Sequence, residues 1–356
     1  MILIATAITL LITTNKQPSI SPTQTQSLEE CQSLSPTTQG AINLVFFSDK
    51  AQAQKYADYF LKIKPYDTNK QSINIYYIPD YEPECELYKD IAILCYSKEL
   101  VKKASSCPND FIIVLKQQPS NIRSSAYMNV LSINTRHPMS VLPHEMGHAL
   151  ANLAEEYTPA KLPSGQKNCV SSCSKFTSEI NECKLGCSEE SYSRSIDNGI
   201  MRTLSSNEYG IYDEMLIQEK IDKKFSTKIT GQVINEDCKD QKYYLIEAGY
   251  NSQDNTIQTI SRSVQKGCVG DNGDGGFTYN LYDSQDNLID TDSFNAELIF
   301  TDAPGEIEID GETYNNDGQF MLKLSALPDA KNLQITHQDK TTEINLQGIG
   351  ASPCRK

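Results

Sequence analysis

Two histidines that share one helix face, His144 and His148 of the segment HEMGH, are the residues best spaced for chemistry. In an α-helix of about 3.6 residues per turn they lie one turn apart on the same side. Two imidazoles in this arrangement bind a single tetrahedral zinc ion. Glu145 is placed to take a proton from a zinc-bound water, whose pKa the metal lowers to about 7. We predict that His144 and His148 bind zinc and that Glu145 is the general base.

The third metal ligand depends on where this helix ends. Asn152 follows the histidines, and asparagine is the commonest residue other than glycine in the left-handed conformation that ends helices. If the helix ends there, Glu155 returns to the metal three residues later, whereas an unbroken helix would carry it about 10 Å beyond His148. Glu155 is therefore the predicted third ligand, and Glu156 is the alternative.

The segment HEMGHALANLAEEY, residues 144–157, resembles the motif HExGHxxxxLxDEY of the peptidase M64 family, the IgA-specific metallopeptidase-like enzymes. The matching residues are His144, Glu145, Gly147, His148, Leu153, Glu156 and Tyr157. The family commonly has glycine at the position of Asn152 and aspartate at the position of Glu155. The resemblance spans roughly residues 40–225 and implies a metzincin-like zinc endopeptidase. It also assigns Met201 to a Met-turn, where a thioether packs below the imidazoles.

Elements before and after this motif predict an α+β, α/β-layered peptidase domain over residues 41–225. Apolar runs predict strands at 42–47, 73–78, 111–115 and 127–133, and helical spacing of apolar residues predicts helices at 50–63, 86–103 and about 206–223. Ser140 is the expected N-cap of the zinc helix. Residues 160–192 are expected to form a cysteine-rich insert between this helix and Met201.

After Phe225 the pattern changes to short strands separated by turns such as DNGDGG and NNDG. The expected strands are 228–234, 243–248, 257–265, 276–282, 296–301, 319–324 and 332–337. About seven short strands with turn signals are typical of an Ig-like β-sandwich. We predict such a domain over residues 226–356, with a role in positioning the enzyme or its substrate and none in the chemistry.

Four of the 11 cysteines form the pattern C-x3-C and C-x3-C within the insert. Cysteines four residues apart share a helix face, so two antiparallel helical turns joined by Cys169–Cys187 and Cys173–Cys183 are expected. A structural zinc site on the same four thiolates is the alternative. In an exported chain disulfides are favoured. One further local bridge is expected among Cys85, Cys95 and Cys107, and another between Cys238 and Cys268.

The first 40 residues favour export. Residues 1–17 contain an apolar run of the length of a signal peptide, with an uncleaved N-terminal anchor as the alternative, and residues 18–40 have the composition of a flexible spacer. We therefore expect an extracellular or cell-surface location, with membrane contact only if the segment is retained. The net charge of −14 argues against nucleic acid as a partner.

Together these features predict an exported zinc metalloendopeptidase that cleaves a protein or peptide lying extended along a sheet edge. The alternative is a non-catalytic exported binding or adhesion protein in which the metal site is structural. A closed structural site requires a fourth protein ligand, and no residue next to the motif is an obvious candidate.

Overall fold

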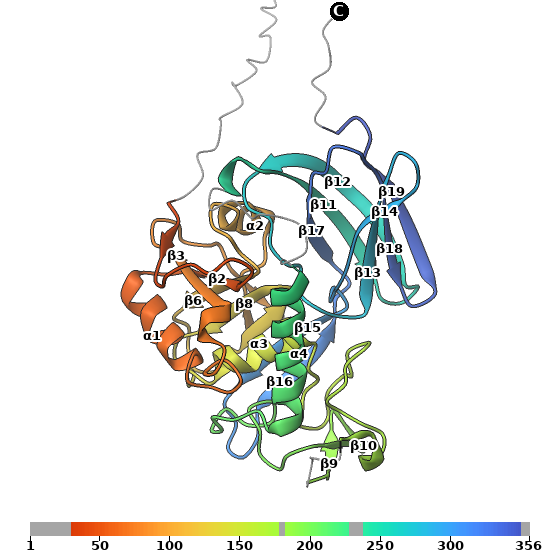
Figure 1. The fold of residues 1–356 in the computed structure, drawn as a ribbon. Coiled ribbons are helices and arrows are strands. Elements are labelled where there is room, and N and C mark those ends of the chain that lie inside the picture. The colour runs from red at the N-terminus through yellow and green to blue at the C-terminus, as the bar shows by residue number, and fades with distance from the viewer. Residues whose placement is uncertain (1–29, 178–181, 228–237, 350–356) are drawn as a thin grey trace, which may run out of the picture.

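The computed structural model describes residues 30–177, 182–227 and 238–349, and its fold is mixed α/β with a preponderance of sheet (Figure 1). The predicted signal peptide or anchor, most of the spacer and Cys354 lie outside the described residues. Within the described ranges, no helix is both long and apolar enough to cross a membrane.

The largest sheet has eight strands in the order β1-β3-β2-β6-β8-β7-β15-β16. These strands are β1 (Gln32–Ser33), β2 (Ile42–Phe47), β3 (Ile73–Ile78), β6 (Phe111–Lys116), β7 (Ser124–Tyr127), β8 (Val130–Asn134), β15 (Leu298–Ala303) and β16 (Asp310–Asn315). Strands β3, β2, β6 and β8 run parallel, while β7 is antiparallel to β8. The strands predicted at 42–47 and 73–78 are confirmed.

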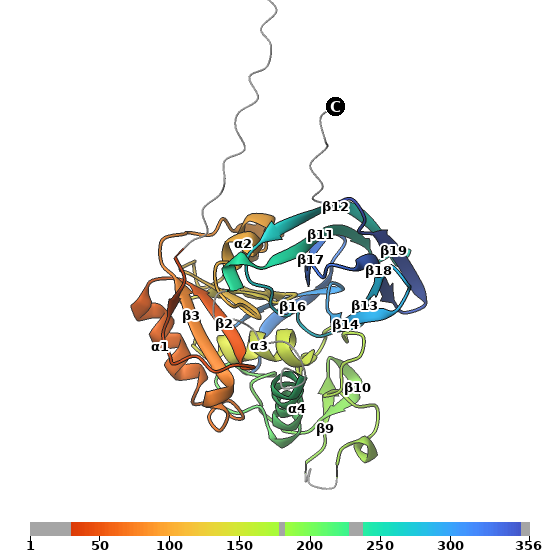
Figure 2. The same ribbon diagram turned by 45° about the horizontal axis from the view of Figure 1, so that its top comes forward.

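Helices cover both faces of this sheet, which explains why β2 and β3 are apolar at every position except Asn43 and Asn74. Leu44 and Phe46 face a core that includes α1 (Lys50–Phe60), α3 (Val141–Ala151) and α4 (Ile211–Thr227). Val45 and Phe47 face the opposite side, toward α2 (Lys98–Ala104). Helices α3 and α4 lie side by side on their face of the sheet (Figure 2).

The helix predicted over 86–103 is wrong in its first half. Residues 86–94 form a hairpin of β4 (Glu86–Tyr88) and β5 (Ala92–Leu94), closed by the disulfide between Cys85 and Cys95. The helix begins at Lys98, because the Ser97 hydroxyl accepts a hydrogen bond from the backbone N–H of Leu100 and caps it.

The C-terminal half builds two further sheets that pack on a shared apolar core. The three-stranded sheet consists of β11 (Lys242–Asn251), β12 (Thr256–Lys266) and β17 (Gln319–Ser325). The four-stranded sheet consists of β13 (Phe277–Asp283), β14 (Leu288–Phe294), β18 (Ala330–His337) and β19 (Lys340–Asn345). The strand expected at 228–234 lies wholly outside the described residues.

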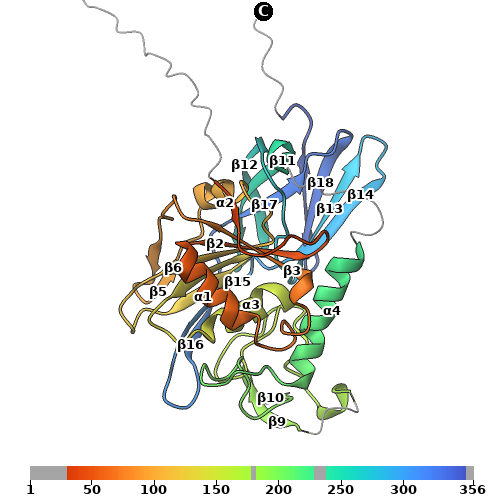
Figure 3. The same ribbon diagram turned by 60° about the vertical axis from the view of Figure 1, so that its left-hand side comes forward.

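The strand expected at 296–301 does not belong to the β-sandwich. As β15 it pairs antiparallel with β7 and continues into β16, so residues 298–315 form a hairpin on the large sheet of the first half. Figure 3 shows the blue β16 reaching away from the sandwich strands. The physical reason is that β7 would otherwise expose unpaired backbone donors and acceptors at the sheet edge. The predicted boundary between a peptidase domain and a separate sandwich is therefore crossed by this hairpin.

In the cysteine-rich insert the structure joins Cys169 to Cys187 and Cys173 to Cys183, which is the pairing expected from the spacing. The expected pair of antiparallel helical turns does not form: the described part of the insert has one short 3-10 turn, Cys173–Lys175, and a hairpin of β9 (Lys184–Cys187) and β10 (Glu189–Arg194). The remaining disulfides are Cys31–Cys107, Cys85–Cys95 and Cys238–Cys268.

Candidate metal centre

Helix α3 brings His144, Glu145 and His148 into the interior, where all three side chains are buried. The helix is apolar on every side apart from these residues, so it packs between the sheet and α4. Ser140 is the N-cap residue of the helix as predicted, but its hydroxyl accepts no hydrogen bond from the first turn and instead donates to the carbonyl of Leu204.

The helix ends at Asn152, which is left-handed with φ 49° and ψ 37°. The backbone N–H groups of Asn152 and Leu153 donate to the carbonyls of His148 and Gly147 and so close the last turn. The break predicted from the sequence is thus confirmed. It turns the chain back across the histidine face.

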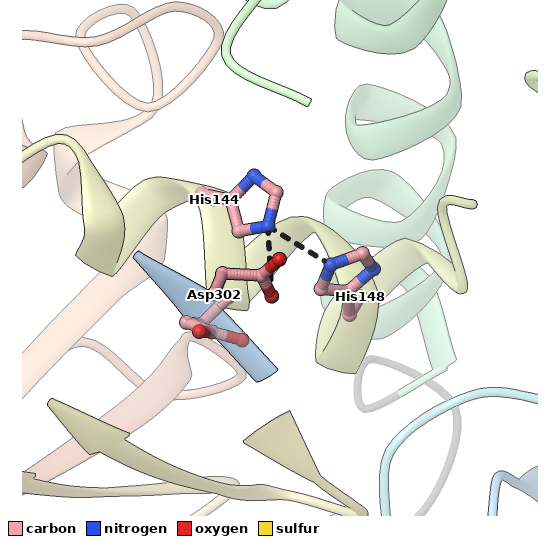
Figure 4. Close-up of side chains that lie close together, drawn as sticks. His144, His148 and Asp302 are labelled. Carbon is pink, nitrogen blue, oxygen red and sulfur yellow. Dashed lines mark hydrogen bonds and ion pairs between the residues drawn. The ribbon is translucent and has the colours of Figure 1, made fainter. Parts of the chain in front are cut away.

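Each imidazole is oriented by a backbone carbonyl. Nδ1 of His144 lies 3.0 Å from the Ile200 oxygen, and Nδ1 of His148 lies 2.7 Å from the Leu153 oxygen. A carbonyl only accepts, so in each ring Nδ1 carries the proton and Nε2 presents its lone pair. The two Nε2 atoms lie 3.1 Å apart (Figure 4). Two facing lone pairs at this distance repel each other unless a cation lies between them.

Two carboxylates complete the arrangement. In the Glu155 carboxylate, Oε1 lies 3.1 Å from Nε2 of His148 and Oε2 lies 3.6 Å from Nε2 of His144. Oδ2 of Asp302 lies 3.3 Å from Nε2 of His144. Ligands of a tetrahedral zinc ion, bound at about 2.0–2.2 Å, lie about 3.3–3.5 Å from one another. Neither Glu155 oxygen has a hydrogen-bond partner, and neither does Asp302 Oδ2. The residues present therefore fit zinc, which these four side chains would hold.

Glu145 also lies close to the histidines and to Asp302: these four residues, without Glu155, form a second grouping in which each offers an atom within 4.8 Å of the others. The side chains of consecutive helix residues point in directions about 100° apart. Glu145 therefore faces the point between the two histidines less directly than Glu155, which follows the end of the helix. Both of its carboxylate oxygens are buried without a hydrogen-bond partner. This placement suits a base beside a metal better than a ligand.

Glu156, the alternative ligand, is buried on the other side of the chain. Its Oε2 lies 3.3 Å from the position that a Cβ on Gly199 would occupy, and its backbone N–H donates to the Met201 carbonyl. Burial, together with the charge of Asp213, raises its pKa well above the ordinary value. The structure brings Glu155 to the histidines and leaves Glu156 away from them.

Met201 lies directly against α3. Its sulfur is 2.8 Å from the position that a Cβ on Gly147 would occupy, and the side chain is fully buried. The preceding carbonyl, that of Ile200, is the one that orients His144. This placement is the one expected of a Met-turn, and the role itself stays a prediction.

Burial dominates the electrostatics of the centre. It lowers the pKa of His148 to about 4, which favours the neutral imidazole that binds metal ions. Burial, with the nearby charge of Asp302 second, raises the pKa of Glu145 and that of Glu155 well above their ordinary values. For Asp302, burial also acts to raise the pKa, but a positive charge beside it, which a protonated His144 supplies when no metal is bound, outweighs burial and holds the pKa below its usual value.

Asp302 is the residue that the sequence did not reveal. It lies on β15, far along the chain from the motif, and its Oδ1 accepts a hydrogen bond of 3.1 Å from the Tyr157 hydroxyl. Local spacing carries no signal for it. No fourth ligand was expected next to the motif, and the carboxylate that lies beside the histidines comes instead from β15, in the second half of the chain.

No protein-family model matches this sequence, and no curated protein matches it either. The likeness to the M64 peptidases therefore depends on the motif residues alone.

Proposed function

We propose that the chain is an exported zinc-dependent metallopeptidase related to the M64 peptidases. The observation that carries the proposal is the pair of buried Nε2 atoms 3.1 Å apart, each with its Nδ1 committed to a carbonyl. Glu155 adds a third ligand from beyond the left-handed turn at Asn152. Catalytic zinc sites typically have three protein ligands. Here a further carboxylate, that of Glu145, lies beside them.

When bound, zinc would act as a Lewis acid on the scissile carbonyl and acidify the attacking water. The chain supplies the proton transfers. Glu145, buried beside the ligands without a hydrogen-bond partner, takes a proton from the water and passes it to the leaving amine. Its raised pKa, caused by burial, suits a group that holds the proton between these two steps.

The disulfides support the exported location. Five of them link the described residues, and such bonds persist mainly in oxidising compartments. The bridges Cys169–Cys187 and Cys173–Cys183 also rule out a zinc site on these four thiolates in the same state, because disulfide sulfurs are not thiolates.

Asp302 favours a second candidate, a non-catalytic exported binding protein whose metal is purely structural. Two histidines and two carboxylates would close the coordination shell. Against this candidate stands Glu145. A structural site has no use for a buried carboxylate without partners, which costs free energy in the folded state.

The experiment is metal analysis combined with cleavage of a casein-type substrate by the wild type and by Glu145→Ala. Both proteins are expected to bind one zinc ion per chain, and any hydrolysis, by the full chain or by the chain lacking residues 298–315 described below, is expected to depend on Glu145. The structural candidate would be favoured if zinc is bound but no cleavage depends on Glu145, including in the chain that lacks residues 298–315.

A further inference from the structure

We propose that Asp302 is a fourth ligand of the same metal and that β15 occupies the place of an extended peptide substrate, so that the described conformation is latent. This inference rests on the proposed function and concerns its regulation. It assigns to the β15–β16 hairpin the role of an internal blocking segment.

The first observation is the sheet edge. Without the hairpin, β7 would be the outermost strand of the large sheet and would run antiparallel to its neighbour β8. β15 pairs antiparallel with β7, with Phe300 opposite Ala126 and Asp302 opposite Ser124. An extended peptide that binds a sheet edge forms the same ladder of backbone hydrogen bonds. Every residue of β15 is buried, so the edge is fully covered.

The second observation concerns the side chains on one face of β15. Residues two apart in a strand point to the same side, so Phe300 and Asp302 both face α3. The Phe300 ring stacks on His148 with centroids 3.8 Å apart, and Asp302 reaches His144. Figure 4 shows the Asp302 carboxylate pointing at the two imidazoles. The strand thus fills both the metal's remaining position and the space beside it.

The third observation is that the strand opposite Asp302 leaves space for its carboxylate. Gly311 of β16 lies opposite Asp302 in the register, and a Cβ there would come within 2.1 Å of Asp302 Oδ1 and 2.3 Å of the Tyr157 hydroxyl. Glycine at this strand position is therefore required for the carboxylate and the phenol to meet. A carboxylate that only happened to lie near the histidines would not need this space.

The fourth observation is how the hairpin is attached. At its base the backbone N–H of Asn316 donates to the Glu297 carbonyl at 2.7 Å, so the two residues that flank the hairpin are joined directly to each other. All seven strands of the two smaller sheets remain paired without it. Toward the first half, ion pairs join Arg123 to Asp310 and Arg202 to Glu308, and such pairs contribute little to stability. Apolar burial holds the hairpin more firmly, since Ile299 belongs to the core of the sandwich and Ile309 to the core around α3. The hairpin lies outside both sandwich sheets, so its departure from the metal centre would leave their strands paired while uncovering these two side chains.

The test uses two variants of the full chain and one control. Asp302→Ala removes the carboxylate, and a deletion of residues 298–315 that joins Glu297 to Asn316 through two glycines removes the strand. Glu306→Ala is the matched control, because Glu306 is an exposed carboxylate in the loop of the same hairpin. The readouts are zinc affinity by chelator competition, binding of acetohydroxamate to the cobalt-substituted proteins by visible absorption, and cleavage of a casein-type substrate.

Asp302→Ala is expected to weaken zinc binding by about 10- to 100-fold or more and to make the cobalt spectrum respond to acetohydroxamate, while Glu306→Ala matches the wild type. The deletion variant is expected to cleave the substrate at least about tenfold faster than the wild type. Unchanged zinc affinity and an unchanged response to acetohydroxamate in Asp302→Ala would overturn the ligand assignment. A wild type that cleaves as fast as the deletion variant would overturn latency.

The metal readouts keep this inference separable from the proposed function. If Asp302→Ala weakens zinc binding and opens the site to acetohydroxamate but no protein cleaves the substrate, the fourth ligand stands. In that case the peptidase proposal fails, and latency fails with it.

Discussion

Asp302 Oδ2 lies 3.3 Å from Nε2 of His144, although the two residues come from opposite halves of the chain. The contact is made because β15 joins the large sheet beside β7 and not the sandwich from which it departs. The two halves are therefore not independent units. A fragment that ended near residue 225 would retain the three predicted ligands His144, His148 and Glu155 and would lack the fourth.

The first prediction concerns the third ligand. Glu155→Ala should weaken zinc binding by at least about a hundredfold, because its carboxylate lies 3.1 Å and 3.6 Å from the two Nε2 atoms. Glu156→Ala should leave zinc affinity within a few-fold of the wild type, since that side chain faces Gly199. Chelator competition on folded protein measures both. The opposite order of effects would identify Glu156, and not Glu155, as the third ligand.

The turn at Asn152 offers a second prediction. Asn152→Ala should destabilise the fold by about 1–2 kcal/mol, because alanine lacks the short amide side chain that lets asparagine tolerate φ of 49°, and should weaken zinc binding by misplacing Glu155. Asn152→Gly keeps the backbone conformation and should bind zinc nearly as well as the wild type, although it loses the 2.9 Å hydrogen bond to the Ser164 carbonyl. Thermal unfolding and zinc titration compare the two. Equal zinc affinities for Ala and Gly would show that the turn does not position the ligand.

A third prediction tests the contact between Gly147 and Met201. Alanine in place of a helical glycine usually stabilises a helix by about 0.5–1 kcal/mol, but here the added Cβ would lie 2.8 Å from the Met201 sulfur. Gly147→Ala should therefore destabilise the protein, by about 1–3 kcal/mol. In a double-mutant cycle, Met201→Ala should relieve part of this loss. Strictly additive effects would mean that the two residues do not press on each other.

Lys323 supplies a prediction about pH. Its Nζ is buried and donates to Asn109 Oδ1 at 2.9 Å, and burial lowers its pKa from 10.5 to about 7. Between these values the unfolded chain holds a proton that the folded chain lacks, so stability should rise as the pH increases from about 7 to 10.5. Below pH 7 both states hold the proton, and the folded state bears the full cost of a buried ammonium group.

Lys323→Met is the matching variant. It should raise the melting temperature at neutral pH and flatten this part of the stability profile, because the apolar side chain needs no deprotonation on burial. Unfolding curves of both proteins across the alkaline range provide the measurement. A wild-type stability that falls steadily from pH 7 to pH 10 while the variant follows it would refute the assignment.

Much of the first half could be predicted because its signals are local. β2 and β3 are mainly apolar strands with helices on both sides of their sheet, and Asn152 marks the end of α3 within a few residues of the histidines. Cys169 and Cys187 lie close enough in sequence for their pairing to be anticipated. In each case the residues that determine the structure lie within one element or one loop.

The missed features depend on contacts between distant segments. Residues 86–94 contain apolar residues at mixed spacing, and the Cys85–Cys95 bridge decides in favour of a hairpin. Asp302 ends a strand that looks like any buried strand, and its approach to the histidines follows from an open edge at β7. Gly311 marks a close approach, as a glycine inside a strand often does, but only the β15–β16 pairing shows that the approaching group is Asp302.

The central claim is peptide hydrolysis at this centre with Glu145 as the base. Its most direct test is cleavage of a casein-type substrate by the chain lacking residues 298–315, with and without Glu145→Gln, at equal zinc content. The account predicts cleavage by the first protein and a loss of about 10²- to 10⁴-fold in the second. A folded, zinc-loaded chain that leaves the substrate intact, or that cleaves it equally well with glutamine at position 145, would contradict the account.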